Sequence, residues 1–140
     1  MKKHKVYLEH ANISVKNVDT TVHFFKTTFP HFRIRGGGNE TRKWLHIGDD
    51  LTYIAISQAE PKTRIHEKDY NETGINHIGF VVEDVAKIAE RLLSEGFQRD
   101  YPKQIEKYRI RDYFTDGEGN QYEFVQYLSE NIDEMNSYDI

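Results

Sequence analysis

The 140-residue sequence contains no cysteine, and it has only three prolines and one tryptophan. The absence of cysteine excludes disulfides, thiolate metal sites and cysteine nucleophiles, and it weakly favours a reducing compartment. Any metal in this protein must therefore be bound by histidine, aspartate or glutamate.

An excess of positive charge and a long apolar run are also missing. The 23 acidic residues outnumber the 19 Lys and Arg residues, and the formal net charge is -4, so we expect no nucleic-acid partner. No apolar run approaches the roughly 18 residues that a membrane span needs, and the first residues do not lead into a signal-peptide core. We therefore expect a soluble, cytoplasmic protein without a membrane partner.

The sequence contains an internal repeat. The segment 8–18 aligns without a gap with the segment 75–85, and His10 and His77 are therefore separated by 67 positions (77 minus 10). In both segments the residues alternate, so that the histidine lies on the strand face opposite an apolar set. The repeat predicts two copies of one structural module.

Each copy continues with the pattern of a helix and three short strands. Asn17 and Asp84 are predicted N-caps, and the apolar residues that follow them recur at helical spacing until Pro30 and Gly96. We expect strands at 32–35, 43–47 and 51–57 in the first copy and at 98–100, 108–115 and 121–127 in the second, with turns at 36–38, 48–50 and 116–120. Each copy is thus a βαβββ module, and the fold class is α+β.

The modules suggest one domain with four parts. We expect a single domain over 1–140 that consists of module one (7–57), a surface linker (58–73), module two (74–127) and a loosely docked acidic tail (128–140). The linker is long enough to pair the modules within one chain or to exchange them between chains.

Glu123 is an unusual residue for its position. It lies in the middle of a predicted strand rich in aromatic and β-branched residues, where an unpaired, desolvated carboxylate costs several kcal/mol. It therefore needs a cation, a hydrogen-bond donor or a water-lined cavity, unless the strand is an edge strand and the carboxylate faces solvent. Pairing of the modules about a pseudo-twofold axis would bring His10, His77 and Glu123 together.

These features resemble the vicinal oxygen chelate superfamily, which includes glyoxalase I, extradiol dioxygenases, fosfomycin-resistance enzymes and bleomycin-binding proteins. The resemblance rests on the duplicated module, the histidine that opens each first strand, and the ending Asp116-Gly-Glu-Gly-Asn-Gln-Tyr-Glu123-Phe-Val. It implies a cup-shaped mixed sheet, the glyoxalase/bleomycin resistance/dioxygenase fold, around a divalent metal. It also implies that His10, His77 and Glu123 bind this metal, which could be Fe, Mn, Zn or Ni.

The fourth ligand position departs from the family pattern. Ala55 is the counterpart of Glu123 in the first module, and a methyl group can neither ligate a metal nor move a proton. Glyoxalase I and the related epimerases are disfavoured for that reason. The remaining set of two histidines and one carboxylate leaves metal positions open for water and substrate, as in extradiol dioxygenases and fosfomycin-resistance enzymes.

The resemblance does not select one reaction. Tyr113 stands ten residues before Glu123, as in the dioxygenase signature, and is the candidate catalytic residue, but the histidine expected upstream is absent from 104–110. For fosfomycin resistance, Asn12 replaces a threonine, and no basic cluster follows Glu123 to bind a phosphonate. We expect a metal-dependent enzyme that acts on a small chelating substrate and is dioxygenase-like or resistance-transferase-like. The alternatives are a non-catalytic, bleomycin-type binding protein and a protein whose site has decayed.

Several polar residues share strand faces with these candidates. They either line a substrate cavity or form a solvated sheet face, and they are Asn12, Ser14, Tyr53, Ser57 and Tyr127. The basic residues around the triple glycine, Arg33, Arg35, Arg42 and Lys43, favour a solvated loop over an anion site. No role is assigned to the histidines without a repeated counterpart, His4, His23, His31, His46 and His66. Because two curved sheets leave edges and a concave face to cover, we expect a homodimer.

Overall fold

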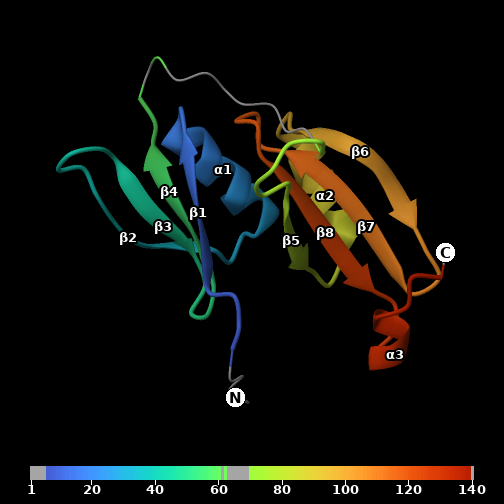
Figure 1. Cartoon of the computed structure of the whole chain (residues 1–140). Coiled ribbons are helices and arrows are strands. Elements are labelled where there is room, and N and C mark those ends of the chain that lie inside the picture. Colours follow the sequence, from blue (N-terminus) through green and yellow to red (C-terminus); the bar gives the residue numbers. More distant parts are fainter. Residues whose placement is uncertain (1–5, 61, 63–69, 140) are drawn as a thin grey trace. The chain divides into compact units, whose positions relative to one another are not determined.

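The computed structural model describes residues 6–60, 62 and 70–139. The chain divides into two compact units, Met1–Ile65 and His66–Ile140, and each unit is described by itself (Figure 1). Half of the predicted linker, together with His4 and His66, lies outside the described residues. Among the described residues, no helix is long and apolar enough to cross a membrane.

The first unit is a four-stranded mixed sheet with one helix. Its elements in chain order are β1 (His10–Val15), α1 (Val18–Thr28), β2 (Arg33–Gly38), β3 (Trp44–Gly48) and β4 (Tyr53–Gln58). The strand order is β1-β4-β3-β2. The strands β1 and β4 are parallel, and the other neighbours are antiparallel.

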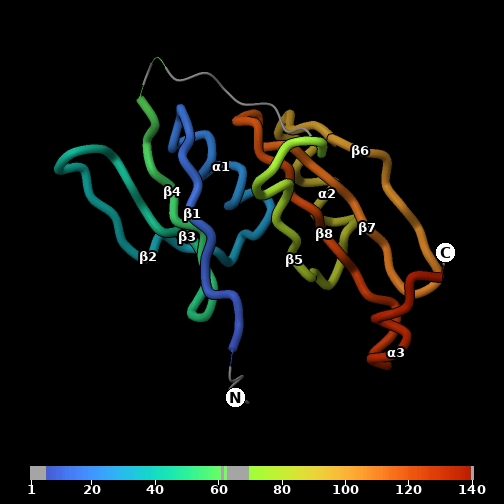
Figure 2. Tube along the Cα trace, in the orientation of Figure 1, coloured from blue at the N-terminus to red at the C-terminus, as the bar shows by residue number. Residues whose placement is uncertain are grey.

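The second unit repeats this topology, and Figure 2 shows the course of its backbone. Its elements are β5 (Ile78–Val81), α2 (Val85–Ser94), β6 (Gln98–Ile105), β7 (Arg109–Thr115), β8 (Gln121–Tyr127) and a short α3 (Ile132–Met135) in the tail. The strand order is β5-β8-β7-β6, with β5 parallel to β8. The predicted α+β class and the two βαβββ modules are confirmed.

The predicted helix caps form as expected. The Oδ1 atom of Asn17 accepts a hydrogen bond from the N–H of Thr20, and that of Asp84 accepts one from the N–H of Lys87, both at 3.1 Å. Gly96 ends α2 with φ of +86°, in the left-handed region that favours glycine. These local signals begin and end the helices at the predicted places.

Each sheet buries one face beneath its own helix. In the first unit the aromatic pair Phe24 and Phe25 of α1 is fully buried, together with the apolar residues Ile54 and Ile56 of β4. In the second unit the buried residues of α2 are Val85, Ile88, Ala89 and Leu92, and the sheet contributes Phe114, Tyr122 and Phe124. Because side chains alternate along a strand, the residues between these core positions face away from the helix.

The triple glycine belongs to a strand, where a turn was predicted. After a register shift that follows Ile34, the three glycines of β2 pair with His46, Leu45 and Trp44 of β3. A Cβ atom on Gly37 would lie 2.8 Å from the carbonyl oxygen of Trp44, so glycine allows the two strands to approach. The strand β6 likewise continues past the predicted end at Asp100 to Ile105.

Candidate metal site

Two of the predicted ligands lie side by side in the second unit. His77 directly precedes β5, and Glu123 lies in the middle of β8, opposite Gly79 in the parallel pair. The Nε2 atom of His77 is 3.0 Å from the Oε1 atom of Glu123. The side chains are 28% and 13% exposed, respectively. Strand pairing therefore brings an imidazole and a carboxylate together at a partly buried position.

The contact of the second ring nitrogen of His77 shows whether this pair could bind a cation. Its Nδ1 atom lies 2.8 Å from the Oδ1 atom of Asn76. A neutral imidazole carries one N–H, so a ring that donates Nδ1–H to Asn76 turns the lone pair of Nε2 toward the carboxylate of Glu123. A bound divalent cation would satisfy both of these donor atoms, and the chemistry of the pair thus fits the metal that the resemblance implies.

Tyr113 lies next to this pair on the adjacent strand. It pairs with Glu123 across β7 and β8, and its ring packs edge-on against His77 with ring centroids 5.8 Å apart. Burial, together with the negative charge of Glu123, raises the pKa of Tyr113 to about 12. The phenol is therefore protonated at neutral pH and can donate a hydrogen bond.

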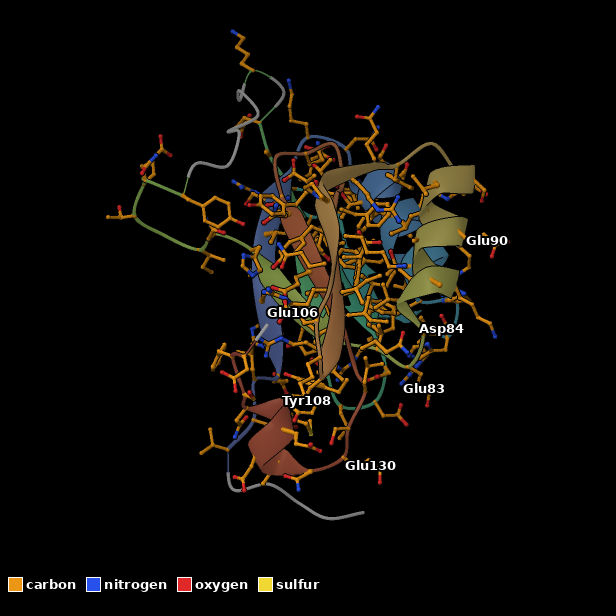
Figure 3. All side chains as sticks on the ribbon, turned by 90° about the vertical axis from the view of Figure 1, so that its right-hand side faces the viewer. Glu83, Asp84, Glu90, Glu106, Tyr108 and Glu130 are labelled. Carbon is orange, nitrogen blue, oxygen red and sulfur yellow. The ribbon has the colours of Figure 1, made fainter. Side chains whose placement is uncertain are left out.

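Arg111 is a neighbour that the sequence analysis missed. Its Nη1 atom is 3.3 Å from the Tyr113 hydroxyl and 4.0 Å from the Oε2 atom of Glu123. Its Nε atom donates to Glu106 at 2.7 Å, and the same buried carboxylate accepts from Arg109 at 3.0 Å. Figure 3 labels Glu106 on one side of the second sheet and Asp84 and Glu90 of the α2 segment on the other.

Strand alternation could have revealed Arg111. The positions 109, 111 and 113 share one face of β7, which is the face that Tyr113 shares with Glu123. No basic cluster follows Glu123 in the sequence, and the guanidinium comes instead from the strand before it, β7.

His10 occupies the corresponding place in the first unit. It begins β1 opposite Tyr53 of β4, and the two rings stack with centroids 4.7 Å apart and planes 9° from parallel. The Nδ1 atom of His10 lies 2.9 Å from the Oε1 atom of Glu9, to which the Tyr53 hydroxyl donates at 3.3 Å. The side chain of His10 is 44% exposed.

His46 joins the same row of rings, although the sequence analysis gave it no role. Its ring stacks on Tyr53 at 4.5 Å, and its backbone pairs with Ala55, the position where the family pattern has a polar group. Burial, followed by the positive charges of His10 and Arg35, lowers the pKa of His46. No repeated counterpart marks His46, so only the strand register could reveal it.

The remaining candidate residues lie on the predicted faces. Asn12 pairs with Ala55 and Ser14 pairs with Ser57 in the β1–β4 ladder, on the His10 face of the first sheet. Tyr127 lies on the Glu123 face of the second sheet, opposite Arg109. Within the described parts of the chain, no group of three or more histidine, aspartate or glutamate side chains is gathered as a metal site. The pair formed by His77 and Glu123 is thus what the second unit supplies by itself.

The chain consists of two βαβββ modules, with His10 at the start of the first strand of one and His77 directly before the first strand of the other. This combination indicates a class of protein, and comparison with known families agrees. The model of the Glyoxalase/Bleomycin resistance protein/Dioxygenase superfamily matches residues 7–124. The chain belongs to this superfamily. No curated protein matches the sequence.

Solved structures with the same fold include fosfomycin-resistance proteins. The FosX protein from Listeria monocytogenes is 18% identical with a TM-score of 0.70, and the match covers 95% of this chain and 97% of that one. FosX from Mesorhizobium loti is 18% identical with a TM-score of 0.71, covering 94% and 98%. A variant of the Listeria protein in complex with Mn(II) and 1S,2S-dihydroxypropylphosphonic acid is 18% identical with a TM-score of 0.71, covering 93% and 98%.

Proposed function

We propose that the protein is a divalent-metal-dependent enzyme that acts on a small, metal-chelating substrate. The observation that carries this proposal is the contact of 3.0 Å between Nε2 of His77 and Oε1 of Glu123. His10, the repeated counterpart of His77, supplies the third ligand, from the same chain or from a second copy. Two imidazoles and one carboxylate form a set that suits Fe(II), Mn(II), Zn(II) or Ni(II).

The residues around the pair have separate roles in this proposal. A bound divalent ion would act as a Lewis acid on the substrate oxygens that chelate it. The neutral phenol of Tyr113 donates a hydrogen bond to a substrate oxygen, and the guanidinium of Arg111 favours a substrate with an anionic group. The residues proposed to line the substrate site are Asn12, Ser14, Tyr53, Ser57 and Tyr127.

The proposed reaction is dioxygenase-like or resistance-transferase-like. A glyoxalase I reaction is disfavoured because Ala55 offers neither a ligand nor a base at the fourth position. The FosX structure with Mn(II) makes that ion the first to test. The competing function is non-catalytic binding of a bleomycin-type molecule, which does not require the metal ligands.

The proposal also covers the oligomeric state and the cellular location of the enzyme. We expect it to act as a homodimer, because a second copy can pair with or cover the edge strands of the sheets. A cytoplasmic location agrees with the complete absence of cysteine.

Titration calorimetry with Mn(II) and Zn(II) tests the proposal. The variants His10→Ala, His77→Ala and Glu123→Ala should each lose tight binding, because two remaining ligands rarely hold a first-row ion against water. His31→Ala is the matched control, since this histidine is 66% exposed and lies outside the proposed site. If wild type binds these ions no better than His77→Ala, the metal-enzyme function is wrong and the binding protein takes its place.

A further inference from the structure

The residue before each candidate histidine provides a hydrogen-bond acceptor to the ring. The Oε1 atom of Glu9 lies 2.9 Å from Nδ1 of His10, and the Oδ1 atom of Asn76 lies 2.8 Å from Nδ1 of His77. Glu9 and Asn76 occupy equivalent positions of the repeat, although they differ in charge. The same contact therefore forms twice, once in each of two units that consist of different segments of the chain.

Glu9 is fixed in place by the strand beside it. Its carbonyl oxygen accepts hydrogen bonds from the N–H of Tyr53 at 3.0 Å and from the hydroxyl of Thr52 at 2.8 Å. Its carboxylate accepts a further hydrogen bond from the Tyr53 hydroxyl at 3.3 Å. These contacts hold the Glu9 carboxylate beside Nδ1 of His10.

The faces of both rings are also supported by aromatic neighbours. Tyr53 stacks on His10, and Tyr113 packs edge-on against His77. Each imidazole thus has an acceptor at Nδ1 and an aromatic ring that limits its rotation. In His77 these contacts direct Nε2 toward Glu123.

We propose that Glu9 and Asn76 are positioning residues that accept Nδ1–H from His10 and His77 and reserve Nε2 of each ring for the metal. This inference rests on the proposed function. An acceptor at one ring nitrogen fixes the tautomer, because a neutral imidazole has only one N–H. It also makes the other nitrogen a better ligand. The carboxylate of Glu9 is the stronger acceptor, so His10 becomes the more basic of the two ligands.

Nitrogen NMR of the imidazoles in the metal-free protein gives the first test. At about pH 9, well above ordinary imidazole titration, His10 should carry its proton on Nδ1 in wild type and in Glu9→Gln. Glu9→Leu should shift the proton toward Nε2. In Glu123→Leu, which removes the competing acceptor, His77 should carry its proton on Nδ1. A His10 ring protonated on Nε2 in wild type, or a tautomer unchanged by Glu9→Leu, overturns the inference.

The Zn(II)-loaded protein gives the second test, with spectra and calorimetric affinity as readouts. Both rings should bind Zn(II) through Nε2 and keep Nδ1–H. Glu9→Leu and Asn76→Leu should weaken binding by about 10- to 100-fold, whereas Glu9→Gln and Asn76→Asp keep an acceptor and should stay near wild type. Equal losses in the leucine and the conservative variants, or ligation through Nδ1, contradict the proposal.

Controls separate this inference from the proposed function and from folding defects. Glu83→Leu removes an exposed carboxylate on the α2 side of the second unit (Figure 3) and should change neither tautomer nor affinity. Glu9→Ala and Asn76→Ala replace any leucine variant that fails to fold. If wild type binds no Zn(II) or Mn(II), the proposed function fails, while the tautomers of the metal-free protein still decide the roles of Glu9 and Asn76.

Discussion

At the scale of single residues, the site depends on a few side chains whose environment differs from that of ordinary surface groups. Tyr113 is 7% exposed and Ala55 is 5% exposed. The sequence indicated both of them, together with His10, His77 and Glu123, because they occupy positions defined by the repeat or by a motif. Neither the repeat nor a motif identifies Arg111 and His46, and only the strand register places them beside Glu123 and Ala55.

The raised pKa of Tyr113 predicts a pH dependence of stability. Its pKa is about 12 in the folded protein, against an ordinary value of 10.0. The unfolded chain therefore loses this proton first, and the contribution of Tyr113 is fully present below pH 10 and is lost as the pH rises through 12. Relative to Tyr113→Phe, wild type should lose about 2 to 3 kcal/mol of unfolding free energy over this range.

Urea denaturation at a series of alkaline pH values measures this difference. Tyr101→Phe, at a half-exposed tyrosine on the neighbouring strand, is the control. Its unfolding free energy should fall with pH as steeply as that of wild type. If the unfolding free energies of wild type and Tyr113→Phe change equally with pH, burial and Glu123 do not raise the pKa of Tyr113.

At the scale of helices and strands, the sequence predicted the helix caps, which depend on nearby residues, better than the strand pairing, which depends on distant ones. The helices α1 and α2 begin at the predicted caps because an N-cap side chain bonds a backbone N–H only three residues away. The strand β2 was missed in part because glycines are typical of turns, and the pairing that makes 36–38 a strand depends on Trp44 to His46. Nonlocal pairing of this kind leaves no pattern within a short window of sequence.

An ion pair within the second sheet gives a prediction about β7. The carboxylate of Asp112 is 1% exposed and accepts hydrogen bonds from Nε and Nη2 of Arg99 on β6. Arg99→Met would leave this buried carboxylate without its cation and should reduce the unfolding free energy by about 3 kcal/mol. The double variant Arg99→Met/Asp112→Leu should recover much of this loss, because no buried charge remains.

Chemical denaturation compares these variants with a pair in the first unit. Arg33 and Asp50 also form an ion pair, but their side chains are 56% and 87% exposed. Arg33→Met should therefore cost less than about 1 kcal/mol. Similar losses for Arg99→Met and Arg33→Met would contradict the role assigned to burial.

At the scale of the whole molecule, the repeat accounts for most of what could be predicted. Because the two halves share one pattern, an assignment made in one half supported the same assignment in the other. Both halves fold into units with equivalent strand orders, β1-β4-β3-β2 and β5-β8-β7-β6. The reaction could not be predicted from the sequence, because neither the repeat nor a motif identifies Arg111, and only the strand register places it beside Tyr113 and Glu123.

The edge strands of the two sheets predict self-association. The strands β1 and β2 end the first sheet, and β5 and β6 end the second. Native proteins cover or pair such edges, and a second copy of the chain can do so symmetrically. Sedimentation equilibrium should give a homodimer at tens of micromolar protein. A monomer at that concentration would contradict the predicted homodimer.

Crystals of the metal-loaded protein test the central claim most directly. Anomalous diffraction from Mn(II)- or Zn(II)-loaded crystals locates the ion independently of any assumption about its ligands. We predict one ion for each set of His10, His77 and Glu123, bound by Nε2 of both histidines and by the Glu123 carboxylate. An ion bound elsewhere, or Nε2 of His77 still in direct contact with Oε1 of Glu123 and no ion between them at saturating metal, would contradict the account.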